Sequence, residues 1–288
     1  MEKVVIAGCG YIGTRIARIW KRNGAGISCL VRSPDRCAAL AGEGYACCAV
    51  SLDDQPATSL PDMTGAVLYY LVPPPGGGIT DSRARNFIER LKNSAPPAKV
   101  IYMSATSVYS ESAGGVVTEE SPTEPRSAMG KRRLDAEDAF REYGRLAGVP
   151  VIVLRVSGIY GPGRLPVMQI SQGQPLLCEA ESGPSNRIHA DDLAAVCLAA
   201  ATKGVDGDIL NVSDGHPSSM TSYFDACADL LGYPRQPQVS MAEARRVMSP
   251  LMLSYVTNAR IVDNARMLQR LQIQLTYPSM LDGLQSCA

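Results

Sequence analysis

Histidine and net charge are two things that this 288-residue chain largely lacks. It has only two histidines, His189 and His216, so a histidine-rich metal site is not expected and we predict no metal. Its 28 lysines and arginines are balanced by 28 aspartates and glutamates. A chain without net charge offers no overall field to nucleic acid or to an anionic membrane, so we expect neither as a partner.

Long apolar runs and regularly spaced cysteines are missing as well. No stretch approaches the roughly 18 apolar residues that span a bilayer. The start, MEKVVIAG, lacks the basic and long apolar segments of a signal peptide. The nine cysteines are odd in number and include no C-x-x-C pair, so the disulfide framework of a secreted protein is not expected. We predict a cytoplasmic protein with free thiols.

What the sequence does contain is an alternation of short apolar runs and helical patterns. Near-continuous apolar runs separated by helices are typical of a parallel sheet covered on both faces. We therefore predict an α/β fold, a doubly wound parallel sheet of the Rossmann type. The predicted strands are Lys3–Gly8, Gly26–Val31, Tyr45–Val50, Gly65–Val72, Ala98–Ser104 and Val149–Val156.

The first predicted strand leads directly into a glycine-rich loop and then a helix. In VVIAGCGYIGTRIA, Gly8, Gly10 and Gly13 have the G-x-G-x-x-G spacing. The first glycine suits a tight turn, the second lets the backbone approach a pyrophosphate, and the third lets the helix pack closely on the strand. A pyrophosphate would lie on the free amides at the start of the helix, around Tyr11 and Ile12. The segment predicts a dinucleotide site.

The end of the second predicted strand bears on which dinucleotide is bound. A free ribose 2′-hydroxyl calls for an acidic residue there, whereas a 2′-phosphate calls for arginine. Arg32 and Ser33 follow this strand, while Asp35 comes after Pro34 and is expected in the first turn of the next helix. Arginine offers a planar fork to a phosphate. We therefore favour NADP(H) over NAD(H), the alternative being that Arg32 is an ordinary surface arginine.

The alternation loosens in the second half of the chain, where turn-rich segments appear. A further strand is expected at Asp208–Asp214, a helix over Ser218–Leu231, and mostly helical patterns from Val239 onward. We predict a dinucleotide-binding domain at 1–160 and a small C-terminal substrate lobe at 161–288, interleaved with the last strands of the same fold.

Several motifs occur in an order that identifies a family resemblance. They are MSATSVYS after the fifth predicted strand, EESPTEP before the next helix, LRVSGIYGPGR, NRIHADDLAAV and ILNVSDG. Over nearly its whole length the chain resembles the extended short-chain dehydrogenase/reductases, the epimerase/dehydratase group. LVPPP and the closing NARIVDNARMLQRL resemble the atypical members. The resemblance implies a small-molecule substrate and a possible homodimer formed through the helices after the fourth and fifth strands.

The resemblance also implies a catalytic set that this chain only partly retains. The family uses a tyrosine four residues before a lysine, and a serine or threonine at the tip of the fifth strand. Lys131 matches the lysine, but Ser127 stands where the tyrosine belongs and Ala105 where the serine or threonine belongs. We therefore predict a member without the catalytic tyrosine, in which Lys131 still holds the cofactor. A serine hydroxyl is a poorer acid than a phenol and is shorter by a ring.

Other hydroxyls near the strand tip are candidates to replace the tyrosine. Ser104 and Thr106 are assigned with Lys131 and Ser127 to the candidate catalytic set. Ser107 is a further hydroxyl, and Tyr109 and Tyr160 remain alternative phenols. Hydroxyls at strand ends usually bond to backbone groups instead. Tyrosines in such loops usually pack with the hydroxyl satisfied.

Five further residues complete the candidate site. Val72 and Pro73, at the tip of the fourth strand, are predicted to line the cofactor. The resemblance implies that Ser157, after the sixth strand, faces the nicotinamide. It also implies that Arg164 and Arg187 meet a substrate phosphate, the alternative being ordinary surface salt bridges.

Two functions remain open. The first is an oxidoreductase-type enzyme that uses NADP(H) on a small carbonyl or sugar-like substrate with an altered proton donor. The second is a non-catalytic module that senses the dinucleotide. Ser127 and Ala105 favour the sensor, whereas Lys131 and the motifs of the substrate lobe favour the enzyme. We favour the enzyme.

Overall fold

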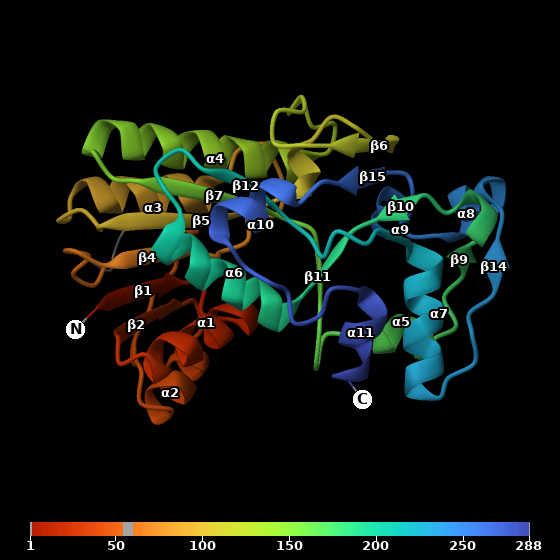
Figure 1. Cartoon of the computed structure of the whole chain (residues 1–288), viewed down its shortest axis with the longest axis horizontal. Helices are drawn as coiled ribbons and strands as arrows, with labels where there is room; N and C mark the ends of the chain where they lie inside the picture. Colours follow the sequence, from red (N-terminus) through yellow and green to blue (C-terminus); the bar gives the residue numbers. More distant parts are fainter. Residues whose placement is uncertain (1, 54–59, 288) are drawn as a thin grey trace.

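A parallel sheet forms the centre of the protein (Figure 1). The computed structural model describes residues 2–53 and 60–287. The seven strands lie in the order β12-β7-β5-β4-β1-β2-β3, and every neighbouring pair is parallel. In chain order they are β1 (Lys3–Ala7), β2 (Gly26–Val31), β3 (Ala46–Ala49), β4 (Val67–Tyr70), β5 (Lys99–Ala105), β7 (Val151–Val156) and β12 (Ile209–Val212). The predicted doubly wound parallel sheet is confirmed.

Helices cover both faces of this sheet, and each face has its own apolar core (Figure 1). One core packs β-strand side chains against α1 (Tyr11–Arg22), α2 (Pro34–Gly42), α6 (Ala190–Lys203) and α10 (Ala265–Leu271). The other packs them against α3 (Ser82–Lys92) and α4 (Ala128–Ala147). Because the strands are buried on both sides, their sequences are almost continuously apolar.

The strand order reverses between β1 and β4. From β1 the chain proceeds outward through β2 and β3, whereas β4, β5, β7 and β12 proceed in the opposite direction. In open α/β sheets, ligands bind outside the carboxyl ends of the strands at such a switch point. The glycine loop follows β1, so the fold places it there.

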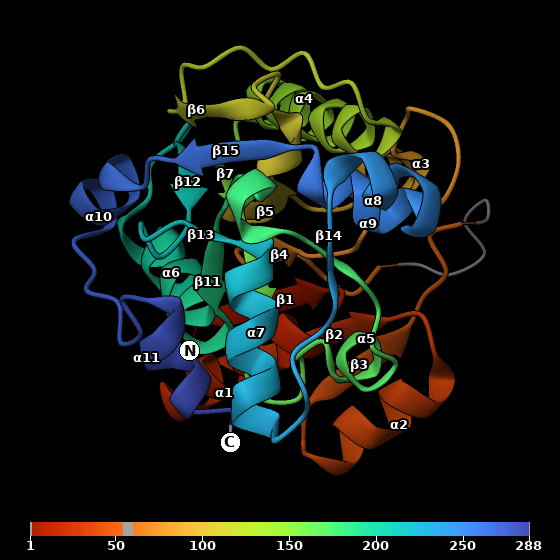
Figure 2. The ribbon, with the colours of Figure 1, turned by 90° about the vertical axis from the view of Figure 1, so that its right-hand side faces the viewer.

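A smaller lobe packs at one end of the sheet (Figures 1 and 2). Its core joins Tyr160, Phe224 and Leu284, which come from segments far apart in the sequence. Its helices are α5 (Val167–Ser171), α7 (Met220–Leu231), α8 (Met241–Val247), α9 (Pro250–Val256) and α11 (Met280–Gln285), with the 3-10 helix η2 (Glu179–Glu181). Its short strands are β8 (Gly158–Tyr160), β9 (Leu176–Leu177), β10 (Pro184–Ser185), β11 (Arg187–His189), β13 (Ser218–Ser219) and β14 (Gln238–Val239).

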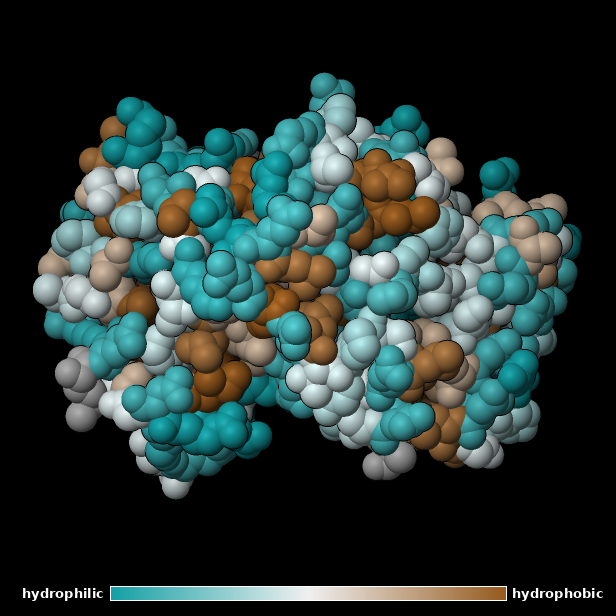
Figure 3. Space-filling model, in the orientation of Figure 1, coloured by the Kyte–Doolittle hydropathy of each residue, from teal (hydrophilic) through white to brown (hydrophobic). Residues whose placement is uncertain are grey.

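The second half of the chain contributes to both parts. α6, β12 and α10 return to the sheet, while α7 and α11 stay in the lobe. The outline of the molecular surface is hollowed between the part that carries α1 and α2 and the part that carries α7 and α11 (Figure 3). The predicted boundary between a dinucleotide-binding domain at 1–160 and a substrate lobe at 161–288 stays a prediction.

The two-stranded pairs outside the central sheet were not predicted, and the pair formed by β6 and β15 is one of them. β6 (Ala113–Val117) pairs in parallel with β15 (Ala259–Val262), which lies in the tail where mostly helical patterns are predicted. This pairing holds the segment after η1 (Thr106–Val108) against the C-terminal part of the chain. Within 2–53 and 60–287, no helix is long and apolar enough to cross a membrane.

Candidate dinucleotide and active site

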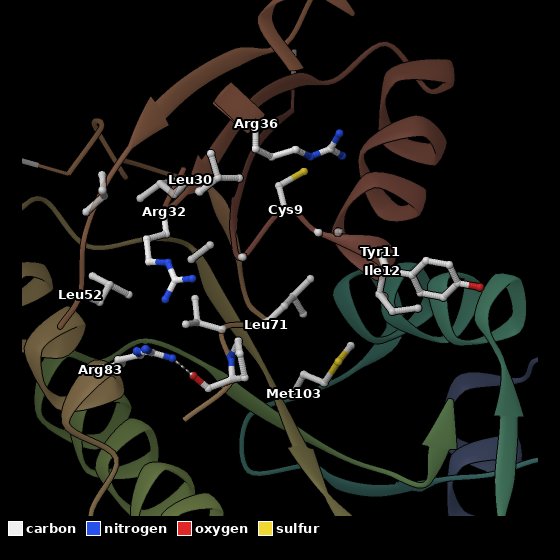
Figure 4. A pocket seen from close by; sticks show the side chains of 18 of the residues that line it. Cys9, Tyr11, Ile12, Leu30, Arg32, Arg36, Leu52, Leu71, Arg83 and Met103 are labelled. Atoms are coloured by element: carbon white, nitrogen blue, oxygen red, sulfur yellow. Dashed lines mark hydrogen bonds between the residues drawn. The ribbon is translucent and has the colours of Figure 1, made fainter. Parts of the chain in front are cut away.

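A cavity of about 600 Å³ opens at the switch point (Figure 4). Its walls come from the glycine loop, the ends of β2 and β4, the start of α3, the tip of β5 and the segment after β7. Among the predicted cofactor ligands, the wall includes Gly8, Gly10, Tyr11, Ile12, Gly13, Arg32, Ser33, Val72 and Pro73. Arg164, a predicted substrate ligand, also lines it.

The glycines are required by close packing. Gly8 has φ +90°, and a Cβ there would lie 2.9 Å from the backbone nitrogen of Val72. A Cβ on Gly13 would lie 2.9 Å from the carbonyl oxygen of Gly8. A Cβ on Gly10, by contrast, would meet nothing nearer than 4.0 Å. The loop is therefore tight against β4 and α1 but open at Gly10, which fits the close approach of a diphosphate.

The start of α1 suits an anion. Gly10 is its N-cap and supplies no side-chain cap, and no acidic residue lies in the first turn. The unused amides and the positive end of the helix dipole therefore face the cavity. The Tyr11 ring lies between two cations, 4.0 Å from the Arg15 guanidinium and 5.2 Å from that of Arg164.

The end of the cavity beyond β2 carries two arginines (Figure 4). Arg32 is exposed and lines the cavity. Arg36 also lines it and donates through Nη2 to Thr14 Oγ1 at 2.7 Å. Ser33 caps α2, accepting a hydrogen bond from the Arg36 amide at 3.4 Å. Sequence reasoning missed Arg36, although it lies in the first turn of α2, four residues after Arg32.

The acidic residue at this end of the cavity is already engaged. Arg83 grips Asp53 with two hydrogen bonds, of 2.5 and 3.0 Å, and donates a third to the Pro73 carbonyl at 3.1 Å (Figure 4). The hydrogen bond from Arg83 lowers the pKa of Asp53. Asp53 therefore neutralises Arg83 and leaves Arg32 and Arg36 available to an anionic ligand.

The cation that the structure brings to the inner wall is Arg133 instead of Lys131. Arg133 is half-buried, lines the cavity and donates to the Met103 carbonyl, at the tip of β5, at 2.9 Å. Lys131 is exposed, and the wall formed by the described residues does not include it. The two positions differ by roughly 200° around the helix axis. That Lys131 reaches the cofactor stays a prediction, whereas Arg133 lies at the cavity wall in this structure.

Ser104 is buried in a polar network below the cavity. Its Oγ donates to Glu137 Oε1 at 2.5 Å, and Arg155 grips the same carboxylate at 2.8 Å. Arg155 also donates to Tyr109, whose hydroxyl donates to Asn211 Oδ1 at 2.6 Å. Because Ser104 is only 2% exposed, its hydroxyl positions strand β5 and is not available as a proton donor. The same holds for the alternative phenol, Tyr109.

The remaining candidate hydroxyls differ in their surroundings. Ser127 is the N-cap of α4, and its Oγ accepts from the Gly130 amide at 3.0 Å. One of its lone pairs is thus used for the helix end, while its O–H proton is not used by this bond. Thr106 is half-buried in η1 just beyond β5, and its carbonyl accepts a hydrogen bond from Arg260. Thr106 lies beside the β5 tip, although the cavity wall formed by the described residues does not include it either.

Ser157 and Arg187 lie deeper, at the border of the lobe. Ser157 is 9% exposed, and its Oγ has no hydrogen-bond partner among the described residues. Arg187 is 5% exposed, stacks 4.1 Å from the Tyr223 ring and donates to Ser218 Oγ at 2.7 Å. Burial lowers its pKa. In this structure Arg187 is an internal clamp between β11 and α7, and the cavity wall described above does not include it or Ser157.

A serine–histidine contact near the C-terminus resembles a hydrolase arrangement without its chemistry. Ser286 Oγ lies 3.1 Å from His189 Nε2. His189 Nδ1 accepts a hydrogen bond from the Asp191 amide, so its proton is on Nε2. A nitrogen that already carries the proton cannot take one from serine. Burial also lowers the pKa of His189, so this contact is structural.

Comparisons with known proteins agree with this geometry. Residues 83–213 match the NAD dependent epimerase/dehydratase family. Protein YeeZ of Escherichia coli K12 is 26% identical over 98% of both chains. The dTDP-D-glucose 4,6-dehydratase of Mus musculus is 30% identical over 42% of this chain and 37% of its own.

Solved structures extend the likeness to the whole chain. A functionally unknown conserved protein from Silicibacter pomeroyi superposes with a TM-score of 0.82 at 26% identity, covering 100% of this chain and 98% of that one. UDP-glucuronic acid 4-epimerase from Bacillus cereus, solved in complex with NAD, gives 0.75 at 18% identity, covering 99% and 95%. Over residues 83–213 this chain is therefore similar to the NAD dependent epimerase/dehydratase family, and its Rossmann-type sheet and glycine loop agree with that similarity.

Proposed function

We propose that the protein binds NADP(H) in the cavity and acts as an oxidoreductase-type enzyme on a small carbonyl or sugar-like substrate. The observation that carries the cofactor assignment is the pair Arg32 and Arg36 at the β2 end of the cavity, with Asp53 neutralised by Arg83. Arginine recognises a phosphate through a planar fork of donors. The alternative cofactor is NAD(H), which the epimerase from Bacillus cereus holds in its crystal structure.

Different residues of the cavity would contact different parts of the dinucleotide. The loop at Gly8, Gly10 and Gly13 would hold the diphosphate, while Arg32, Ser33 and Arg36 would hold the 2′-phosphate. Val72 and Pro73 would form the wall beside it, and Arg133 would supply the cation at the inner end. When bound, the nicotinamide supplies hydride transfer.

The proposed enzyme needs a proton donor other than the tyrosine that the resemblance implies. The Ser104 hydroxyl donates its proton to Glu137, and Ser127 lies at the start of α4 as its N-cap. Thr106 is the hydroxyl just beyond the β5 tip. Arg133, donating to the Met103 carbonyl beside that tip, would orient the reacting end. A threonine hydroxyl is a weak acid, so slow turnover is expected unless the substrate supplies its own acidic group.

The positions of the candidate catalytic side chains support a second candidate function. Lys131 is exposed and is not part of the cavity wall formed by the described residues, and the Ser104 hydroxyl donates to Glu137. A site that binds the dinucleotide without a proton donor would serve as a sensor. Turnover separates the two functions, because only the enzyme consumes a substrate.

Fluorescence titration with NADPH and NADH tests the cofactor assignment. Wild type is expected to bind NADPH more tightly, and Arg32→Ala is expected to weaken NADPH binding by tenfold or more, since a hydrogen bond to a charged group contributes about 1.5–3 kcal/mol. NADH affinity should change by less than about twofold, because NADH lacks the phosphate. Tighter binding of NADH by wild type would overturn the assignment.

A screen of carbonyl and nucleotide-sugar substrates tests the enzyme against the sensor. Turnover by wild type that Thr106→Val lowers by about 10² or more would support Thr106 as the proton donor. The absence of turnover with every substrate, together with intact NADPH binding, would favour the sensor.

A further inference from the structure

Arg260 is a buried arginine that is only partly satisfied by its surroundings. It belongs to β15 and is 7% exposed. Its Nη1 donates to the Thr106 carbonyl, while its Nε is buried and has no hydrogen-bond partner among residues 2–53 and 60–287. None of the ion pairs within that part of the chain includes Arg260. A buried charge without a partner is costly, so this one requires an explanation.

The unpartnered Nε belongs to the edge with which other arginines of this protein bind carboxylates. A guanidinium offers parallel N–H groups from Nε and Nη2, which fit the two oxygens of a carboxylate. In this structure that edge holds an aspartate or a glutamate at Arg83, Arg85, Arg145, Arg155 and Arg235. Arg260 instead uses Nη1 for a backbone carbonyl. Its Nε is therefore left for a partner that the described residues do not supply.

The ends of β5 and β7 lie side by side at this position. Ala105 and Val156 are partners in the register of the two parallel strands, so Thr106 and Ser157 come next on neighbouring strands. β5 also carries Met103, which lines the cavity (Figure 4). The position thus adjoins the cavity at the carboxyl edge of the sheet, where ligands of such folds bind.

Arg260 is fixed to both strand ends through the backbone. Its guanidinium binds the Thr106 carbonyl after β5. Its own carbonyl accepts a hydrogen bond from Asn186 Nδ2 at 2.7 Å, and the Asn186 carbonyl accepts one from the Gly158 amide at 3.0 Å. Gly158 directly follows Ser157 at the end of β7. These contacts hold the guanidinium beside the two strand ends.

Two serine hydroxyls at the same strand ends also lack partners. Ser157 Oγ and Ser107 Oγ are buried and have no hydrogen-bond partner within the described ranges. Ser157 follows β7, and Ser107 lies in η1 next to Thr106, whose carbonyl binds Arg260. Three unpartnered groups that can donate, one of them cationic, therefore lie at the ends of adjacent strands. An anion with several lone pairs complements such a set of donors.

We propose that Arg260, with Ser107 and Ser157, binds a carboxylate of the substrate, which makes the substrate a small carbonyl compound with a carboxylate near its reacting carbon. This rests on the proposed function, because that function takes Thr106 as the proton donor. A carboxylate on the Nε edge of Arg260 would lie beside Thr106, since Arg260 holds the carbonyl of that residue. Such a carboxylate has two sources, a 2-oxo acid and a sugar acid, which the experiment distinguishes.

The charge around Arg260 favours an anion over a neutral group. Burial lowers the pKa of Arg260, and the charge of Glu111 offsets this only in part. The Glu111 carboxylate itself accepts a hydrogen bond from the Ala113 amide. A bound carboxylate would neutralise the guanidinium through charge-assisted hydrogen bonds. A neutral hydroxyl or amide in its place would leave the buried charge uncompensated.

Isothermal calorimetry with matched probes tests the carboxylate itself. Pyruvate is compared with pyruvamide, and D-glucuronate with D-glucose, on the free protein and at saturating NADPH. In one pair the carboxylate should bind about tenfold or more tightly than its neutral partner, and that pair identifies the source. Equal affinity within both pairs, no binding of either carboxylate, or tighter binding of inorganic phosphate than of both would overturn the proposal.

Variants of Arg260 test the residue. Arg260→Lys keeps the charge without the fork, and Arg260→Gln keeps a donor for the Thr106 carbonyl without the charge. Both should lower carboxylate affinity by about tenfold or more and change the affinity for the neutral probe by less than about twofold. Arg266→Gln is the matched control, because its guanidinium is already bound by Glu120. Wild-type carboxylate affinity in both Arg260 variants would overturn the proposal.

Ser157→Ala keeps the proposal testable if the Arg260 variants fail to fold. Its hydroxyl has no partner in the described structure, so its removal should not lower the free energy of unfolding. Carboxylate affinity should nevertheless fall by about threefold or more. Unchanged affinity would remove Ser157 from the site and contradict the proposal as stated. Carboxylate binding is also measured without dinucleotide, so a protein that failed to bind NADPH would refute the proposed function alone.

Discussion

Single residues make the cavity positive in a protein that is neutral overall. Its wall carries Arg32, Arg36, Arg83, Arg133 and Arg164 against one acidic side chain, which Arg83 holds. Low-dielectric walls lined by one sign of charge concentrate ligands of the opposite sign. The local excess suits a dinucleotide with two or three phosphates, whereas the net charge of zero conceals it.

Arg133 and Lys131 offer a direct comparison within one helix. Arg133→Ala should weaken NADPH binding by tenfold or more, because the guanidinium at the cavity wall is lost. Lys131→Ala, which removes an exposed cation two positions away, should change the affinity by less than about twofold. Isothermal calorimetry measures both. A larger loss in Lys131→Ala than in Arg133→Ala would show that the helix presents its other face to the ligand.

Asp214 should make stability depend on pH. Burial raises its pKa from 3.8 to about 6, so the folded protein binds this proton more tightly than the unfolded chain. Its contribution is therefore present below about pH 4 and is lost as the pH rises through 6.

Urea unfolding of wild type and Asp214→Asn between pH 4 and pH 7 measures this effect. The free energy of unfolding of wild type, relative to the variant, should fall by about 2 kcal/mol between pH 4 and 6. A difference that stays flat over this interval, or rises, would contradict the assignment.

At the scale of elements, α4 connects three parts of the site. Arg132 donates to the carbonyls of Gly77 and Gly78 at 3.0 and 2.6 Å, which ties down the loop after β4. Arg133 faces the cavity, and Glu137 enters the buried network below it. A shift of α4 would therefore disturb the loop, the wall and the β5 tip together.

The N-cap of α4 separates a structural role of Ser127 from a catalytic one. Ser127→Ala should lower the free energy of unfolding by about 1 kcal/mol, because the Gly130 amide loses its acceptor. Ser127→Asp keeps an acceptor at the positive end of the helix and should restore stability. Chemical denaturation and NADPH titration on the same samples measure this. Loss of turnover in Ser127→Ala at wild-type stability would instead indicate catalysis.

At the scale of the whole molecule, the first helix is bound to segments from the second half of the chain. Tyr11 donates to the Pro162 carbonyl at 3.0 Å, and Arg15 pairs with Asp191 at 2.8 Å. The cavity wall likewise includes Ile159 and Arg164. A ligand that fills this cavity contacts both halves of the chain and should stabilise them as one unit. The homodimer through α3 and α4 remains a proposal, which sedimentation analysis would test.

Saturating NADPH should raise the melting temperature. Ligand at 100 times its dissociation constant adds about 2.7 kcal/mol, which corresponds to roughly 5 °C or more for a chain of this size. Gly10→Ala is the control, since its Cβ has space in the free protein but fills the opening that a diphosphate would approach. Calorimetry should show little shift for this variant. An equal shift in both proteins would place the ligand elsewhere.

Local sequence pattern was sufficient to predict the sheet, the glycine loop and the position of Arg32 after β2. Apolar runs of strand length and the spacing of Gly8, Gly10 and Gly13 depend on neighbours in the chain, and the structure has β2 at the predicted residues, Gly26–Val31. The pairing of β6 with β15 could not be read in this way, because it joins segments more than 140 residues apart.

Contacts between segments far apart in the chain determine which candidate side chains reach the cavity. The rotation of α4 against β5 turns Arg133 inward and Lys131 outward, and the burial of Glu137 and Arg155 takes the Ser104 hydroxyl out of reach. The pairing of Cys29 with Cys47 likewise arises from the register of β2 and β3. The type of a residue limits the reactions in which it can take part. Its orientation and its hydrogen-bond partners decide which of these reactions is available, and only the folded chain determines them.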